Sequence, residues 1–179
     1  QANAAIRLLN IIEKLNKKFP DMEISIATNE TKKIIDDLLD FKIDIGFVVG
    51  RPKNKEIIVL NRVDEDLCLI QSNKFESKNC LIGYREDSIH FNYLKEYMMK
   101  NENKEFNTMT FQNYHLIQEM VAKGYGKAFI FKDLIEKYGF SNSFNMIKID
   151  SNEEQLSTFM ICRKNNMPII SNFLKKMKL

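Results

Sequence analysis

Apolar and polar residues change period several times along this chain, and each period predicts one kind of element. In residues 4–17 the apolar positions recur every three or four residues, which is the period of a helix with one buried face. Between Met22 and Thr28 apolar and polar residues alternate, as in a half-buried strand. A second helix is expected to start at Thr31, a favoured capping residue type. Residues 43–49 are almost wholly apolar, as in a strand covered on both faces.

The rest of the chain continues as short strands and helices. Further strands are expected at 57–60, 66–71, 80–84, 105–110, 127–131, 144–149 and 155–163, and further helices at 89–100, 113–123, 132–138 and 168–177. Such alternation predicts parallel sheets joined by right-handed crossovers. The polar stretch 71–79 is the expected lobe boundary. We therefore expect an α/β fold of two Rossmann-like lobes with mainly parallel sheets, formed by residues 1–70 with 164–179 and by residues 71–163.

Composition and charge exclude a membrane-spanning or a disordered chain. Hydrophobic residues make up 44% of the 179 positions and charged residues 28%, and no apolar run approaches the length that spans a bilayer, roughly 18 to 20 residues. The formal net charge is only +3, and Lys32 and Lys33 are followed closely by Asp36 and Asp37. We therefore expect a solvated surface, no membrane partner and no DNA-binding face on this chain.

The cysteines and the chain start bear on the compartment. Cys68, Cys80 and Cys162 are an odd number at wide spacing, each within an apolar stretch. This pattern predicts buried free thiols in a reducing cytoplasm. The chain opens at Gln1 without an initiator methionine or a secretory signal, so we expect a cytoplasmic fragment of a longer protein.

No motif for catalysis, cofactor binding or metal binding stands out. There is neither a nucleophile elbow nor a phosphate-binding loop, and His90 and His115 have no cysteine or histidine at ligand spacing. Gly124-Tyr125-Gly126 follows a helix and precedes a strand, the reverse of the dinucleotide-binding order. Gly124 is instead expected to end the helix in a left-handed conformation. We therefore expect neither an enzyme nor a bound cofactor or metal.

Polar residues open four of the expected helices, at 1–3, 28–31, 85–88 and 112–113. Free amide groups at a helix start can hold an anion, and ligands of open α/β sheets bind beyond the carboxyl ends of the strands. Arg85 could also pair with a carboxylate through two parallel hydrogen bonds. Ordinary helix capping remains the alternative at each of these positions.

Two long stretches and the chain end carry a specific order of features. The first is LNIIEKLNKKFPDMEISIATNETKKIIDDLLDFKIDIGFVV, in which a helix ends at Phe19-Pro20 and a final apolar strand begins with Asp44 and Gly46. The second is HLIQEMVAKGYGKAFIF, a helix, a Gly-x-Gly turn and a strand, and the chain closes with MICRKNNMPIISNFLKKM. This order resembles the effector-binding domain of LysR-type transcription regulators, whose two-lobed fold is similar to type 2 periplasmic binding proteins.

The resemblance implies a small-molecule effector bound between the lobes, and a lobe movement on binding. The implied ligand-binding residues are Gln1, Ala2, Asn3, Thr28, Asn29, Thr31, Arg85, Ser88, Gln112 and Asn113. It also implies a homodimer or higher oligomer paired through the helices at 4–17 and 113–123. DNA would be contacted only through an N-terminal winged helix-turn-helix domain absent from this chain. The family's first strand would precede residue 4, so we expect the first sheet to lack a member or to be completed in another way.

Two other functions share this fold. A solute-binding protein of a transporter would have the same cleft, but the absent signal or lipid anchor and the three thiols oppose it. An enzyme related to prephenate dehydratase or porphobilinogen deaminase is the other alternative, although no motif for a nucleophile, a general base or a cofactor supports it. The residues do not identify the effector, the target genes, or whether the regulator activates or represses.

Overall fold

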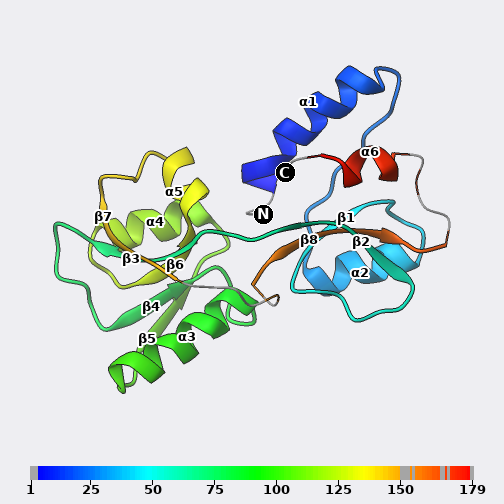
Figure 1. The fold of residues 1–179 in the computed structure, drawn as a ribbon. Coiled ribbons are helices and arrows are strands. Elements are labelled where there is room, and N and C mark those ends of the chain that lie inside the picture. The colour runs from blue at the N-terminus through cyan, green and yellow to red at the C-terminus, as the bar shows by residue number, and fades with distance from the viewer. Residues whose placement is uncertain (1–3, 150–153, 155, 166–167, 169, 178–179) are drawn as a thin grey trace. The chain divides into compact units, whose positions relative to one another are not determined.

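The chain forms two compact units in a computed structural model, which describes residues 4–149, 154, 156–165, 168 and 170–177. One unit comprises Gln1–Asp64 with Asn152–Leu179, and the other comprises Glu65–Ser151 (Figure 1). The chain therefore passes from one unit to the other twice. Each unit has its own strands and helices.

The first unit is built around an antiparallel sheet with strand order β1-β8-β2. Its strands are β1 (Gly46–Val49), β2 (Ile57–Val63) and β8 (Thr158–Arg163), and its helices are α1 (Leu9–Lys18), α2 (Thr31–Leu39) and α6 (Ser171–Lys175). A π-helical turn, η1 (Ala4–Leu8), leads into α1. The central strand β8 is buried at every position. A strand with partners on both sides and helices on both faces has no exposed position.

The core of the first unit lies on both faces of β8. Met160 and Cys162 pack with Ile11 and Leu15 of α1 and with Leu174 of α6. Phe159 and Ile161, which point to the other face because strand side chains alternate, pack with Leu38 of α2 and with Val48. In Figure 1, α1 and α6 lie above this sheet and α2 lies below it.

Among its described residues, the second unit combines one parallel and two antiparallel strand pairs. Its strands are β3 (Leu67–Ser72), β4 (Cys80–Gly83), β5 (Asn107–Thr110), β6 (Ala128–Phe131) and β7 (Phe144–Lys148). β3 pairs antiparallel with both β6 and β7, whereas β4 pairs parallel with β5. A parallel bridge between Leu81 and Lys127 joins β4 to the segment that enters β6.

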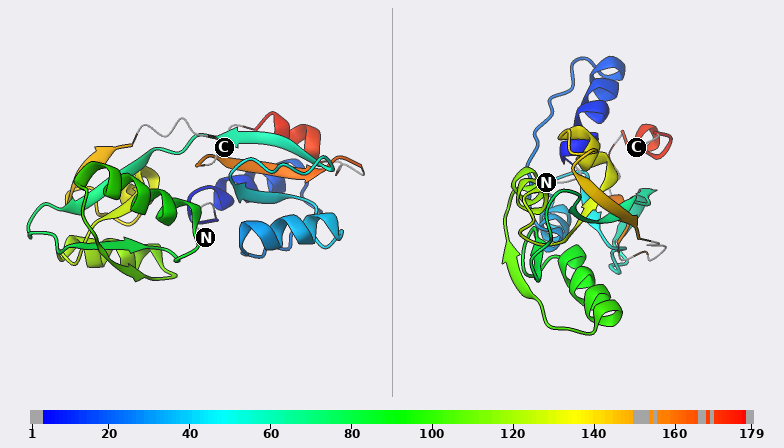
Figure 2. Two further views of the ribbon diagram at one scale, coloured as in Figure 1. Left: turned by 90° about the horizontal axis from the view of Figure 1, so that it is seen from below. Right: turned by 90° about the vertical axis from the view of Figure 1, so that its left-hand side faces the viewer.

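Three helices cover the strands of the second unit: α3 (Ile89–Glu102), α4 (Tyr114–Ala122) and α5 (Lys132–Lys137). α3 lies on one side of the strands, and α4 and α5 lie on the other (Figure 2). α3 approaches β4 closely at Gly83, where a Cβ atom would lie 2.3 Å from the ring of Phe91. Gly124 ends α4 with a φ of +79° and donates to the carbonyl of Val121 at 2.9 Å. The expected left-handed helix end is therefore confirmed.

The expected strand at 22–28 is wrong, because these residues take no part in a strand ladder. Met22 and Ile24 instead pack from the loop against the core of the first unit. The alternation therefore reflects one-sided burial without strand hydrogen bonds. Thr31 is the first residue of α2 rather than its cap, a position that Glu30 occupies.

Strand pairing also differs from the expectation. Only the β4–β5 pair and the Leu81–Lys127 bridge are parallel among the described residues, so mainly parallel sheets were a wrong expectation. The units divide at Asp64 and Ser151 rather than at the expected boundaries after residues 70 and 163. The boundaries differ because β8 inserts between β1 and β2 and so belongs to the first unit, whereas β3 inserts between β6 and β7 and so belongs to the second.

Candidate functional site

In the first unit the predicted polar loop lies at the carboxyl end of β1. Thr31 Oγ1 accepts a hydrogen bond of 3.3 Å from the backbone amide of Val49, the last residue of β1. Thr28 and Asn29, on the loop that leads into α2, are exposed, and Thr31 is half-buried. The fold therefore joins the start of α2 to the strand end where ligands of α/β sheets bind.

The start of α2 lacks a capping hydrogen bond from its N-cap side chain. The N-cap residue is Glu30, whose side chain makes no capping hydrogen bond, and the first turn that follows it contains no acidic residue. The first amide groups of a helix have no intrahelical acceptor, and the helix dipole adds a partial positive charge there. An anionic oxygen from a ligand can therefore take the place that a capping side chain would fill.

In the second unit the candidate residues follow the parallel strands β4 and β5. The amide of Phe111 donates to the carbonyl oxygen of Gly83 at 2.9 Å, so the segments after the two strands leave from the same edge. Arg85 and Ser88 follow β4, and Gln112 and Asn113 follow β5. The structure thus brings these four predicted residues to one edge of the second unit.

Two of these four residues are helix caps. Ser88 Oγ accepts from the amide of Phe91 at 3.3 Å, and Asn113 Oδ1 accepts from the amides of His115 and Leu116 at 2.9 and 3.1 Å. Each side chain satisfies the start of its own helix, so its first role is structural. The starts of α3 and α4 consequently differ from the uncapped start of α2.

Arg85 already holds a carboxylate. Its Nε and Nη2 atoms donate to Oδ1 and Oδ2 of Asp87, both at 2.9 Å. The Arg85 side chain is 30% exposed and that of Asp87 is 66% exposed, so solvent screening keeps this pair weak. The predicted bidentate geometry is present, with an internal carboxylate in place of a ligand.

Sequence reasoning missed an aromatic pair at the same edge. The rings of Tyr84 and Tyr114 stack with centroids 4.8 Å apart and an angle of 11° between their planes. Burial, and to a smaller degree the nearby Tyr84 and Glu65, raise the pKa of Tyr114 far above its ordinary value. Tyr114 therefore remains a neutral phenol. The sequence did hold one signal for this pair, because Tyr84 directly precedes the predicted residue Arg85 and Tyr114 directly follows the predicted residue Asn113.

The cysteines offer little redox chemistry. Cys68, Cys80 and Cys162 are free and buried, as their apolar sequence context predicts. Burial raises the pKa of each thiol. The reactive thiolate form is therefore scarce at neutral pH.

Three of the predicted ligand-binding residues cannot be placed. Gln1, Ala2 and Asn3 lie outside the described residues. Within the described ranges, no group of three or more histidine, cysteine, aspartate or glutamate side chains could hold a metal ion. No helix within those ranges has the length and apolar character needed to cross a membrane.

Comparison with known proteins identifies the family of the chain. The LysR substrate binding domain family matches residues 2–175. The HTH-type transcriptional regulator SoxR of Arthrobacter sp. (strain TE1826) is 23% identical over 176 residues, which are 95% of this chain and 60% of that protein. The chain thus spans about 60% of the length of this relative.

Solved regulatory domains share the fold. The reduced form of the regulatory domain of OxyR2 from Vibrio vulnificus superimposes with a TM-score of 0.74 at 12% identity, over 98% of this chain and 89% of that one. The regulatory domain of CcmR from Synechocystis PCC6803, in complex with 2-PG, has a TM-score of 0.73 at 12% identity, over 97% and 92%. The effector-binding domain of QuiR, in complex with shikimate, has a TM-score of 0.69 at 15% identity, over 97% and 89%. The chain therefore belongs to the LysR substrate binding domain family and has its periplasmic-binding-protein-like α/β fold.

Proposed function

We propose that this domain senses a small anionic metabolite and transmits its binding to the DNA-binding domain of a cytoplasmic transcription regulator. The observation that carries the anionic character is the uncapped start of α2 beside Thr31 and the end of β1. Two structural neighbours hold small organic ligands, shikimate and 2-PG, which supports a ligand of similar size.

The first unit supplies hydrogen bonds to the charged group of the effector. Thr28 and Asn29 are exposed, and the α2 amides carry the positive end of the helix dipole. A hydrogen bond to a charged group contributes about 1.5 to 3 kcal/mol. The Thr31 hydroxyl, which accepts from Val49, still has its own hydrogen to donate to an anionic oxygen.

The second unit supplies an aromatic surface and a guanidinium group. The stacked rings of Tyr84 and Tyr114 offer an apolar face and neutral hydroxyl groups to the body of the effector. A ligand carboxylate can replace Asp87 on Arg85, since that exposed pair is weak. In this proposal Ser88 and Asn113 position the helices, and Gln112, which is exposed, is the weakest ligand contact.

The effector acts by binding one state of the domain more tightly than another. A ligand with equal affinity for both states would shift nothing, and a shift from 1:99 to 99:1 needs a preference of about 5.5 kcal/mol. Two or three charged hydrogen bonds made in only one state supply energy of that order. The full-length regulator would convert this shift into altered DNA binding.

The active form is proposed to be a homo-oligomer. Leu9 of α1 is 64% exposed and Leu116 of α4 is 37% exposed, and these two helices are the surfaces that the family resemblance implies for pairing. Apolar side chains on both helices support such a contact, because apolar side chains gain stability when an interface covers them.

A thermal-shift screen of the chain tests the sensor proposal. The panel contains small carboxylates, amino acids, aromatic acids and inorganic anions, each with a neutral analogue. A ligand at 100 times its dissociation constant stabilises the fold by about 2.7 kcal/mol, which raises Tm by roughly 5 to 10 °C in a domain of this size. A stabilising acid whose neutral analogue is inert is the expected result. A chain that melts cooperatively and responds equally to acids and neutral analogues, or to none, contradicts the proposal.

A further inference from the structure

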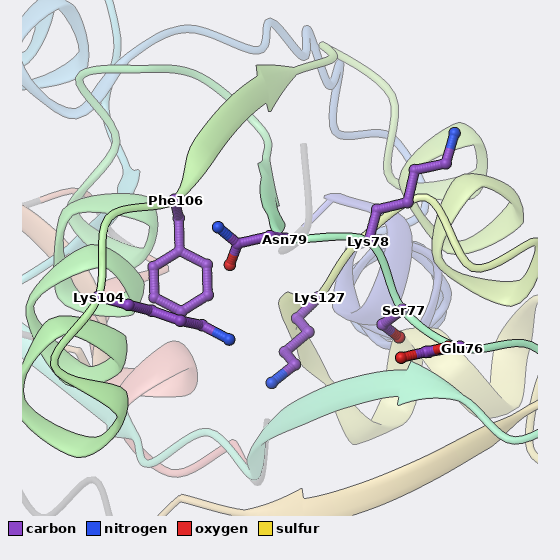
Figure 3. A pocket seen from close by; sticks show the side chains of 7 residues that line it. All are labelled: Glu76, Ser77, Lys78, Asn79, Lys104, Phe106 and Lys127. Atoms are coloured by element: carbon purple, nitrogen blue, oxygen red, sulfur yellow. The ribbon is translucent and has the colours of Figure 1, made fainter.

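The second unit contains a cavity at the amino ends of β4 and β5. Its volume is about 460 Å³. Its wall comes from three segments: the approach to β4, the turn between α3 and β5, and the residue before β6. The lining residues are Glu76, Ser77, Lys78, Asn79, Lys104, Phe106 and Lys127 (Figure 3).

This cavity is separate from the surface that follows β4 and β5. The two strands are parallel, with Cys80 opposite Asn107 and Gly83 opposite Thr110. Tyr84, Arg85 and Asn113 follow the carboxyl ends, whereas the cavity residues precede the amino ends. A ligand in this cavity would therefore not compete for the proposed effector contacts of this unit.

Two ammonium groups converge in the cavity. Figure 3 shows Lys104 and Lys127 directed toward the same region, whereas Lys78 points away from them. Lys78 lies over the ring of Tyr125, with Nζ 4.4 Å from the ring centroid. Lys127 is held firmly, because its amide and carbonyl both bond to β4 and its side chain is only 18% exposed.

Glu102 already forms ion pairs with these two lysines. Its Oε1 accepts from Lys127 Nζ at 2.5 Å, and its Oε2 lies 2.7 Å from Lys104 Nζ. Burial raises the pKa of Glu102, but the hydrogen bonds and charges of Lys104 and Lys127 outweigh this and hold the pKa below its ordinary value. The protein thus stabilises one carboxylate here, and each ammonium group keeps further N–H donors.

Two further features favour a ligand over a purely internal ion pair. Ser77 Oγ is buried and has no hydrogen-bond partner among the described residues. A buried hydroxyl without a partner is costly. Phe106 adds an apolar wall, and Lys104 Nζ lies 5.0 Å from the centroid of its ring.

We propose that this cavity is a second binding site, for a small organic anion whose phosphate or carboxylate group meets Lys104, Lys127 and Ser77 and whose apolar body covers Phe106. Glu102 is an internal competitor for the two lysines. Asn79 connects two segments of the wall, the approach to β4 and the turn before β5, since its Nδ2 donates to the carbonyl of Glu105 at 2.8 Å.

Titration of the chain with phenyl phosphate, followed by backbone amide NMR shifts, tests this site. Phenol is the neutral matched probe. Inorganic phosphate and benzoate show whether binding depends on the presence of an anionic group or on its chemical type. Saturable shifts are expected at residues 76–79, 104–106 and 127 with the phosphate and carboxylate probes, and none with phenol. Shifts that do not saturate, or that spread over exposed lysines elsewhere, would overturn the site.

Variants at the cavity sharpen the test. Glu102→Gln removes the competitor and is expected to tighten phenyl phosphate binding about tenfold, and Lys104→Met to weaken it about tenfold, because charged hydrogen bonds are the strong ones. Ser77→Ala is expected to weaken binding severalfold without lowering Tm, since its hydroxyl has no protein partner to lose. Lys100→Met, an exposed position on α3 outside the lining, is the control. Equal affinities in all four variants contradict the proposal.

Discussion

Arg163, on the buried strand β8, donates a hydrogen bond of 2.7 Å from its Nη1 to the carbonyl oxygen of Leu38 at the end of α2. The same nitrogen donates to the carbonyl of Ile43 at 2.7 Å. Its guanidinium lies 4.3 Å from the ring centroid of Phe41. The side chain of Arg163 thus connects β8 to the end of α2 and to the turn that follows it.

Replacement of Arg163 by methionine is expected to lower the free energy of unfolding by about 2 to 4 kcal/mol. The variant keeps the apolar stem but removes the guanidinium donor from both carbonyl groups, so that Leu38 keeps only the 3.3 Å bond from the amide of Phe41. Removing one partner of a buried hydrogen bond is the costly way to lose it. Urea unfolding followed by circular dichroism measures the change. Arg51→Met, in an exposed pair with Glu154 of the same unit, is the control and should change stability by less than about 1 kcal/mol.

The ligand role of Thr31 is separable from its structural role. Thr31→Val keeps the shape and removes the hydroxyl at the start of α2, so we expect about tenfold weaker binding of an acid found in the thermal-shift screen. Stability should fall by only about 1 kcal/mol, since the 3.3 Å bond from Val49 is a modest one. Isothermal titration and urea unfolding give the two numbers. Unchanged affinity in Thr31→Val would remove Thr31 from the effector site.

Asn113 is expected to act mainly through stability. Asn113→Ala leaves the amides of His115 and Leu116 without their acceptor and should cost about 0.5 to 2 kcal/mol, the usual range for a lost cap. Gln112→Ala, at the exposed neighbouring position, is the matched control and should be close to neutral. A larger loss for Gln112→Ala than for Asn113→Ala would contradict the capping role.

Stability is expected to fall in alkaline solution. Burial raises the pKa of Cys68, Cys80 and Cys162 in the folded protein, so the folded state holds these protons more tightly than the unfolded state. The contribution is complete below the ordinary thiol pKa, about 8.5, and is lost as pH rises through the raised values. Urea unfolding between pH 7 and 10 measures this slope.

Cys162→Ala provides the control for the alkaline effect. The substitution removes one titrating group, so the decline of the unfolding free energy with pH should become shallower whatever the cost of the smaller side chain at pH 7. Cys162 is fully buried in the core of the first unit, so a cavity term is expected at every pH. An unaltered slope would exclude Cys162 as a contributor.

The pairing surfaces can be tested by charge. Leu9→Glu on α1 and Leu116→Glu on α4 place a carboxylate on exposed apolar positions and are expected to shift a homo-oligomer toward monomer. Met99→Glu on α3, at a position that is 62% exposed, is the control and should not. Sedimentation velocity over a range of concentrations measures the shift. A chain that is monomeric at all concentrations before substitution contradicts pairing by this domain alone.

The local elements were predictable from the sequence because they depend on neighbours along the chain. The three-to-four period of residues 4–17 predicts the helical segment that includes α1, and the apolar run at 43–49 contains β1. The helix end at Gly124 follows from the backbone freedom of glycine. The order of these elements was also sufficient to indicate the LysR family, which the match over residues 2–175 confirms.

Strand pairing and side-chain contacts were decided only by tertiary structure. Nothing local in residues 155–163 indicates that β8 would insert between β1 and β2, since its apolar run suits a buried strand in either unit. The stacking of Tyr84 on Tyr114 and the ion pair of Lys127 with Glu102 likewise join positions that are far apart in sequence. Periodicity reports which face of an element is buried, but the partner on that face depends on how the whole chain closes on itself.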